Sequence, residues 1–149
     1  MHFSLLLFVE HIRKNQMIST IIIDDEQHAR NTLKGMLMRY FPEKINIIAS
    51  VESVKEGVFA IHKLHPDLVF LDIEMPGENG FKLFDYFDQT PFSVIFTTAY
   101  QNFAIDAFKV SALDYILKPI SQSALQDAIS LFEKKKAKGI SSDHIEKLL

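Results

Sequence analysis

The chain has 149 residues, of which 48% are hydrophobic, so it is long enough for one ordinary domain with a sizeable core. Its formal net charge is −3 and its pI is about 6.0, which excludes the global basic field that binding of nucleic acid by this chain would favour. It contains no cysteine, which excludes disulfides, thiolate metal sites and cysteine catalysis and fits a cytoplasmic protein.

Residues 1–16 precede the first predicted strand and contain the apolar stretch Phe3–Val9. This stretch is much shorter than the about 20 apolar residues that a helix needs to span a bilayer. It also lacks a basic segment before it and a small-residue cleavage site after it, which argues against a signal peptide. Because Met17 directly precedes the first strand, we expect residues 1–16 to be an N-terminal extension of undefined status and expect no membrane association.

Short apolar runs, each followed by polar or turn residues, predict strands that are buried on both faces, as is typical of a parallel sheet. The predicted strands are residues 18–24, 45–49, 67–72, 92–97 and 112–117.

A helix is predicted after each strand, from apolar residues at helical spacing. Ser53 and Glu56 form a capping box at the start of the second helix, and the spacing of Phe81, Phe84 and Phe87 predicts a third helix packed on the sheet. The other helices are predicted around residues 29–40, around 104–108 and from residue 121 onward. Strands that alternate with helices indicate a doubly wound α/β fold with five helices and a five-stranded parallel sheet in the flavodoxin-like order 2-1-3-4-5.

Charged and hydroxyl residues follow four of the predicted strands. The first strand ends in Asp24 and Asp25, the third in Asp72, the fourth in Thr97 and Thr98, and the fifth in Lys118, which precedes Pro119. In an open parallel sheet, ligands bind beyond the carboxyl ends of the strands. The predicted order places the first and third strands side by side, so we expect the three carboxylates, a hydroxyl and the ammonium to meet at one edge.

Three carboxylates in one site repel one another and require a cation. Ligation by oxygen alone, with waters completing the shell, favours Mg²⁺, with Mn²⁺ as the alternative. A carboxylate can also act as a nucleophile and form an aspartyl phosphate, while a metal ion and Lys118 offset charge on the transferring oxygens. The pattern therefore indicates phosphoryl transfer, and a cis bond between Lys118 and Pro119 would suit a constrained turn for the lysine.

The chain from about residue 17 to 135 resembles the receiver domain of two-component response regulators, which have a CheY-like fold. The motifs that carry the resemblance are Ile23-Asp24-Asp25-Glu26, Leu71-Asp72-Ile73-Glu74-Met75-Pro76-Gly77, Thr98-Ala99 and Lys118-Pro119. They occur in the order and at the spacing of that family.

The resemblance implies roles for individual residues in a magnesium-dependent site. Asp72 is implied to be the phosphoacceptor, and Asp25 a direct metal ligand. Asp24 would hold the metal through water, and the backbone carbonyl of Glu74 would complete the protein ligands, with Asp72 itself also binding the metal.

The resemblance also implies a switch rather than an enzyme, one that promotes its own aspartyl phosphorylation and dephosphorylation. Thr98 is implied to be the switch hydroxyl that bonds the phosphoryl group, Lys118 the lysine of the site, and Tyr115 the switch aromatic residue. Thr98 is preferred to Thr97 because Ala99 follows it, and a small residue there leaves room for the phosphoryl group.

The segments Thr97–Tyr100 and Ala112–Pro119 look more specifically like those of LytTR-type transcriptional regulators. This implies a sensor histidine kinase as partner and an output domain that regulates transcription, joined through a linker at residues 136–149. We expect this chain alone not to bind DNA specifically, because DNA binding would belong to a C-terminal domain beyond residue 149. A homodimer through the fourth helix, fifth strand and fifth helix is also implied.

Two other interpretations stay open at this point. The chain could be a stand-alone receiver that acts by protein contact or as a phosphorelay carrier. It could also be an independent Mg²⁺-dependent phosphatase, although its short loops leave little material for a cap or a substrate pocket. A flavodoxin is excluded because the acidic segment after the first strand would repel a flavin phosphate.

Overall fold

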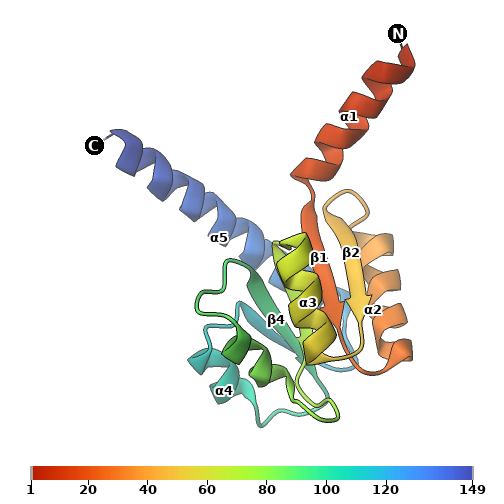
Figure 1. Cartoon of the computed structure of the whole chain (residues 1–149), viewed down its shortest axis with the longest axis vertical. Coiled ribbons are helices and arrows are strands. Elements are labelled where there is room, and N and C mark those ends of the chain that lie inside the picture. Colours follow the sequence, from red (N-terminus) through yellow and green to blue (C-terminus); the bar gives the residue numbers. More distant parts are fainter. Residues whose placement is uncertain (1, 149) are drawn as a thin grey trace.

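Five parallel strands form one sheet in the computed structural model, in the order β2-β1-β3-β4-β5 (Figure 1). The structure describes the backbone of residues 2–148 and the side chains of residues 4–12 and 16–139. The strands are β1 (Ile18–Ile23), β2 (Ile45–Val51), β3 (Leu68–Asp72), β4 (Ser93–Thr98) and β5 (Asp114–Leu117). The predicted strand order and the parallel sheet are therefore confirmed.

A helical segment follows every strand, and one more helix precedes the first strand. The helices are α1 (His2–Gln16), α2 (Gln27–Tyr40), α3 (Val54–Leu64), the 3₁₀ helix η1 (Gly80–Tyr86), α4 (Ala104–Lys109) and α5 (Gln122–Leu148). The doubly wound α/β fold is confirmed, and the five helical segments that follow the strands are four α-helices and η1.

The apolar strands divide their side chains between two cores. In β3, Leu68 and Phe70 face the core that α2 and α5 cover, and Val69 and Leu71 face the core that α3, η1 and α4 cover. All four side chains are completely buried. Alternation along a strand explains this division, and helices on both faces explain why the strands read as continuous apolar runs.

The connection between β3 and β4 differs from the expected α-helix, because η1 is a 3₁₀ helix. Phe81 and Phe84 both lie against Phe96 of β4, with ring centroids 4.9 and 6.1 Å away. A 3₁₀ helix has three residues per turn, so a three-residue spacing aligns side chains on one face. Phe87 lies after the end of η1, where it stacks on His62.

Of the two hydrogen bonds predicted for the capping box at the start of α3, the structure has one. The Ser53 hydroxyl accepts a hydrogen bond from the Glu56 amide at 3.1 Å. The Glu56 carboxylate accepts one from the Glu52 amide at 3.0 Å, one residue earlier than the amide of the N-cap residue. The helix still begins at Val54, because the serine supplies the acceptor that its first amides need.

The two chain ends lie at the amino-terminal end of the sheet, away from the carboxyl edge of the strands (Figure 1). Helix α1 leads directly into β1, and five consecutive apolar side chains from Leu5 to Val9 are exposed on it. Helix α5 continues as far as Leu148, so residues 136–148 extend a helix and are not irregular. Among the described residues, no helix is long and apolar enough to cross a membrane. The boundaries 1–16, 17–135 and 136–149 stay predictions.

Candidate functional site

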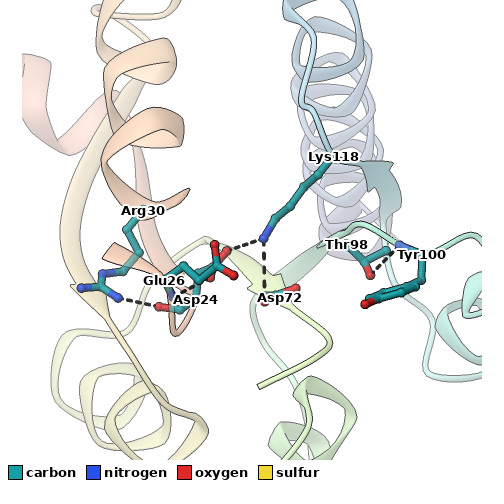
Figure 2. A network of polar contacts seen from close by, with 7 residues as sticks. All are labelled: Asp24, Glu26, Arg30, Asp72, Thr98, Tyr100 and Lys118. Carbon is teal, nitrogen blue, oxygen red and sulfur yellow. Dashed lines mark hydrogen bonds and ion pairs between the residues drawn. The ribbon is translucent and has the colours of Figure 1, made fainter. Parts of the chain in front are cut away.

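The polar residues that follow the strands converge at the carboxyl edge of the sheet. Asp24 and Asp25 follow β1, Asp72 ends β3, Thr98 ends β4 and Lys118 follows β5. Figure 2 shows Lys118 extended towards Asp24 and Asp72, with Thr98 on the neighbouring strand and its hydroxyl directed to Tyr100. Since β1 pairs directly with β3, the acidic residues of the two strands become neighbours.

Three carboxylates form a compact cluster at this edge. One oxygen of each of Asp24, Asp25 and Asp72 lies within 4.8 Å of the other two. Asp24 and Asp72 are buried, with exposed fractions of 4% and 6%, and Asp25 is half-buried. Oxygen-only donors at this spacing fit a hard divalent cation such as Mg²⁺, which keeps several waters and takes one or two carboxylates. Glu74 follows Asp72 by two residues, and its carbonyl stays a predicted ligand.

The carboxyl group of Asp72 has a strongly raised pKa. Burial raises its pKa from 3.8 to about 7, and repulsion from Asp24 and Asp25 acts in the same direction, while Lys118 and the amide of Ile73 oppose the shift. Burial and the neighbouring carboxylates thus both disfavour the ionised form of Asp72. A divalent cation would stabilise that form, so the donor set fits Mg²⁺ on electrostatic grounds as well.

Lys118 supplies the cationic side of the site. Its Nζ donates a hydrogen bond to Asp24 Oδ2 at 2.8 Å and lies 3.7 Å from Asp72 Oδ2 (Figure 2). Burial lowers the pKa of Lys118, but the bond to Asp24 and the charge of Asp72 outweigh it, so the pKa is raised overall. The lysine therefore stays charged. The Lys118–Pro119 peptide bond is cis, the isomer that such a turn permits.

Thr98 and Tyr115 are linked through the backbone of Tyr100. The Tyr100 amide donates to Thr98 Oγ1 at 3.2 Å, and the Tyr115 hydroxyl donates to the Tyr100 carbonyl. Thr98 is completely buried, whereas Tyr115 is half-buried and burial raises the pKa of its hydroxyl. The Thr98 hydroxyl and the Tyr115 hydroxyl are thus connected by hydrogen bonds to the amide and the carbonyl of the same residue, Tyr100.

The loop after Asp72 depends on two glycines. Gly77 has φ of +84°, a left-handed conformation that other residues rarely adopt. Gly80 approaches the backbone of Asp72 so closely that a Cβ atom on it would lie 2.3 Å from the Asp72 carbonyl oxygen. Its amide donates to the Ile73 carbonyl at 2.7 Å. This loop therefore folds back against the strand end that carries Asp72.

The sequence analysis missed two contributors to the site. Arg30 of α2 donates to the Asp24 carbonyl at 2.7 Å, and the Glu26 amide donates to Asp24 Oδ1 at 3.0 Å. No strand-end pattern points to Arg30, because it lies in a helix. Its position six residues after Asp24, one turn into α2, is the signal that was available.

A 2-1-3-4-5 parallel sheet with an acidic cluster, a buried threonine and a charged lysine at its carboxyl edge defines a receiver-type signalling domain. The response regulator receiver domain matches residues 20–130 of the sequence, and the chain belongs to this family. The predicted family resemblance is thereby confirmed.

Curated relatives include regulators named LytT and BtsR. The chain is 34% identical over 130 residues to the sensory transduction protein LytT of Bacillus cereus, covering 86% of this chain and 52% of the relative. It is 36% identical over 124 residues to the transcriptional regulatory protein BtsR of Escherichia coli K12, covering 82% and 51%. The chain thus spans about half the length of these relatives, and the LytTR-type resemblance is confirmed.

Solved receiver structures share the fold. The signal receiver domain of a LuxO repressor protein from Vibrio parahaemolyticus superposes with a TM-score of 0.72 at 22% identity, covering 84% of this chain and 97% of that one. The response regulator domain of CheB from Thermotoga maritima gives a TM-score of 0.64 at 27% identity, covering 81% and 95%. Each of the two matches extends over nearly the whole of the solved receiver domain, which confirms the CheY-like fold.

Proposed function

We propose that Asp72 accepts a phosphoryl group from a sensor histidine kinase in a Mg²⁺-dependent reaction, and that this switches an output domain that regulates transcription. The observation that carries the proposal is the cluster of Asp24, Asp25 and Asp72 beside Lys118 at the edge of the sheet. The family supports it, because receiver domains are the signal-accepting modules of response regulators.

The proposed reaction is an in-line transfer to the Asp72 carboxylate. An oxygen of Asp72 attacks phosphorus, the bond from phosphorus to the donor nitrogen breaks, and the leaving imidazole of the donor keeps the electron pair and takes up a proton. Mg²⁺ held by Asp25, Asp72, the Glu74 carbonyl and, through water, Asp24 would offset charge on the phosphoryl oxygens; Mn²⁺ could replace it. Lys118 would move from Asp24 to a phosphoryl oxygen, a short step because it lies 3.7 Å from Asp72.

Switching is proposed to involve Thr98 and Tyr115. Thr98 would donate its hydroxyl to the phosphoryl group, and Tyr115 would turn inward to the space that Thr98 vacates. Their link through Tyr100 supports this coupling, because its amide bonds Thr98 and its carbonyl accepts from Tyr115. Phosphorylation would then shift a pre-existing equilibrium between two arrangements of β4, α4 and β5.

Treatment with acetyl phosphate followed by mass spectrometry tests the phosphoacceptor. The wild-type chain should gain one phosphoryl group in the presence of Mg²⁺ and none with EDTA. Asp72→Asn should gain none, whereas Asp88→Asn, at an exposed aspartate before β4, should react like the wild type. Undiminished labelling of Asp72→Asn would contradict the assignment of Asp72 as the phosphoacceptor.

A homodimer through α4, β5 and α5 is proposed as the signalling form. On α4, Ile105 and Phe108 are 72% and 84% exposed, and Leu117 of β5 is 38% exposed. Exposed apolar side chains on neighbouring elements are typical of a protein interface. Light scattering with and without beryllofluoride tests it: the wild type should dimerise with the phosphoryl mimic, and Phe108→Ser should stay monomeric.

The output is proposed to be DNA binding by a C-terminal domain beyond residue 149, with the protein acting in the cytoplasm, where it has access to DNA. BtsR, one of the relatives, is named a transcriptional regulatory protein, which supports this output. A gel shift comparing residues 1–149 with the natural full-length product tests it. Specific binding by residues 1–149 alone, or a native stop codon directly after Leu149, would favour a stand-alone receiver that acts by protein contact or in a phosphorelay.

A further inference from the structure

Arg30 contacts the acidic site through the backbone and not through a carboxylate. Its guanidinium donates from the first turn of α2 to the carbonyl oxygen of Asp24 at 2.7 Å, and Figure 2 shows the side chain extended towards that atom. A cation in the first turn of a helix is opposed by the helix dipole. The position of Arg30 is therefore explained by this contact better than by the stability of α2.

The Asp24 carbonyl needs such a donor because it lies just beyond the sheet. The pairing of β1 ends at Ile23, which is opposite Leu71 of β3 and Val51 of β2. Asp24 is nevertheless only 4% exposed, and a buried carbonyl without a donor is costly. A hydrogen bond from a charged guanidinium is among the stronger ones available to it.

Asp24 is consequently held by four separate bonds. Its amide donates to the Val51 carbonyl at 3.1 Å, and its carboxylate accepts from the Glu26 amide at 3.0 Å and from Lys118 at 2.8 Å. Arg30 supplies the fourth bond and is the one that fixes the carbonyl. The carbonyl belongs to the peptide unit that joins Asp24 to Asp25, and a rotation of that unit would redirect the Asp25 side chain.

We propose that Arg30 is a positioning residue for the divalent-cation site: by holding the Asp24 carbonyl it orients the Asp24–Asp25 peptide and so keeps Asp25 directed into the cluster with Asp72. This inference rests on the proposed Mg²⁺ site. By this inference the cation affinity depends also on Arg30, a residue that touches neither the metal nor the phosphoryl group.

Positioning and simple electrostatics make opposite predictions for Arg30. A positive charge near a cation site repels the cation, so if Arg30 acted only as a charge, its neutralisation would tighten Mg²⁺ binding. If it positions Asp25, its removal weakens binding despite the loss of a positive charge. Substitution of groups that orient metal ligands typically reduces metal affinity by about 10-fold to 100-fold.

Calorimetric titration with Mg²⁺, at a temperature where each protein is folded, distinguishes the two. Arg30→Gln should bind Mg²⁺ about 10-fold more weakly than the wild type. Arg30→Lys, which keeps the charge but replaces the guanidinium with a shorter, differently directed ammonium, should also bind more weakly. The matched control is Arg39→Gln on the same helix, since Arg39 is exposed and lies over the Tyr40 ring; it should bind like the wild type.

Equal or tighter binding of Mg²⁺ by Arg30→Gln overturns the inference while leaving the proposed function intact. A lower melting temperature with unchanged Mg²⁺ affinity identifies Arg30 as merely structural and also overturns it. A wild-type protein that binds no Mg²⁺ overturns the proposed function, and the inference with it. Amide shifts of Asp25 and Glu26 in metal-free Arg30→Lys provide a second readout, and unchanged shifts count against positioning.

Discussion

Lys118 donates its close hydrogen bond to Asp24, at 2.8 Å, and not to the proposed phosphoacceptor. The lysine therefore acts as an internal counter-ion for the acidic cluster, in the same region that a divalent cation would occupy. We expect it to compete with Mg²⁺ for the charge of the cluster. The two cations cannot both reach their shortest distance from Asp24.

Lys118→Gln should consequently bind Mg²⁺ more tightly than the wild type, although it accepts phosphoryl groups more slowly. The affinity should rise about 5-fold or more, since a unit-charge pair 4 Å apart is worth about 1 kcal/mol even in water. Without Mg²⁺ at pH 8, the variant should lose about 2 kcal/mol in free energy of unfolding, because a hydrogen bond between charged groups is lost.

Lys44→Gln is the matched control for this prediction. Lys44 pairs with Glu133 at 3.1 Å, but both side chains are about half exposed. An exposed pair contributes little, so neither stability nor Mg²⁺ affinity should change measurably. Calorimetry and thermal unfolding measure both quantities, and weaker Mg²⁺ binding by Lys118→Gln would contradict the idea of competition.

The raised pKa of Asp72 predicts a pH dependence of stability in the absence of metal. Its folded-state pKa of about 7 lies above the ordinary 3.8, so folding favours the protonated carboxyl group. The stability due to this group is fully present below pH 3.8 and is lost as the pH rises through 7. In EDTA, the melting temperature of Asp72→Asn should therefore rise relative to that of the wild type as the pH increases from 5 to 8.

Metal binding should have the opposite dependence on pH. Mg²⁺ requires the ionised carboxylate, so the affinity of the wild type should increase as the pH rises from 6 to 8. Titrations at several pH values check this. A flat profile of Mg²⁺ affinity, or a melting-temperature difference between the two proteins that stays constant from pH 5 to pH 8, would show that Asp72 ionises at its ordinary pKa.

Thr98→Ala should be phosphorylated like the wild type yet respond poorly. The Tyr100 amide loses its acceptor, which costs about 1 kcal/mol in stability, and the proposed hydroxyl donor to the phosphoryl group is gone. NMR shifts of residues 100–120 should change with beryllofluoride in the wild type and stay nearly constant in the variant. Thr97→Val is the control, and a loss of response in Thr97→Val with a normal response in Thr98→Ala would reverse the assignment of the switch hydroxyl.

Gly80→Ala should destabilise the protein and disturb the acidic site. The new Cβ would lie 2.3 Å from the Asp72 carbonyl oxygen and 3.1 Å from the Ile73 Cα, so strand β3 or the loop must shift. Crowding of this kind costs about 1–3 kcal/mol. We also expect weaker Mg²⁺ binding, because the carboxylate of Asp72 moves with its backbone.

Gly35→Ala provides the contrasting control. Gly35 lies in the interior of α2, and a Cβ atom there meets nothing within 4 Å. Alanine at such a position should add about 0.5–1 kcal/mol of stability and leave Mg²⁺ binding unchanged. Denaturant unfolding of the two variants checks the pair, and equal effects would contradict the close approach of Gly80 to β3.

The sequence by itself determined the fold class and the residues of the candidate site. Runs such as Leu68–Leu71 are apolar on both faces because helices cover both sides of a parallel sheet, and that pattern is local in the chain. The polar residues directly after such runs were also visible. The alternation of strands and helices indicated a doubly wound sheet, for which the flavodoxin-like strand order was adopted. Residues such as Asp25 and Lys118 could therefore be chosen without the structure.

Only the tertiary structure decided which partner each of these residues has. That Lys118 bonds Asp24 instead of Asp72, and that Arg30 reaches the Asp24 carbonyl, depends on how β1, β5 and α2 pack. The same holds for η1, where a three-residue spacing of phenylalanines is compatible with two helix types until the loop is packed against β4. Distances of a few ångströms between segments far apart in the chain are set by core packing, and no local pattern of residues encodes them.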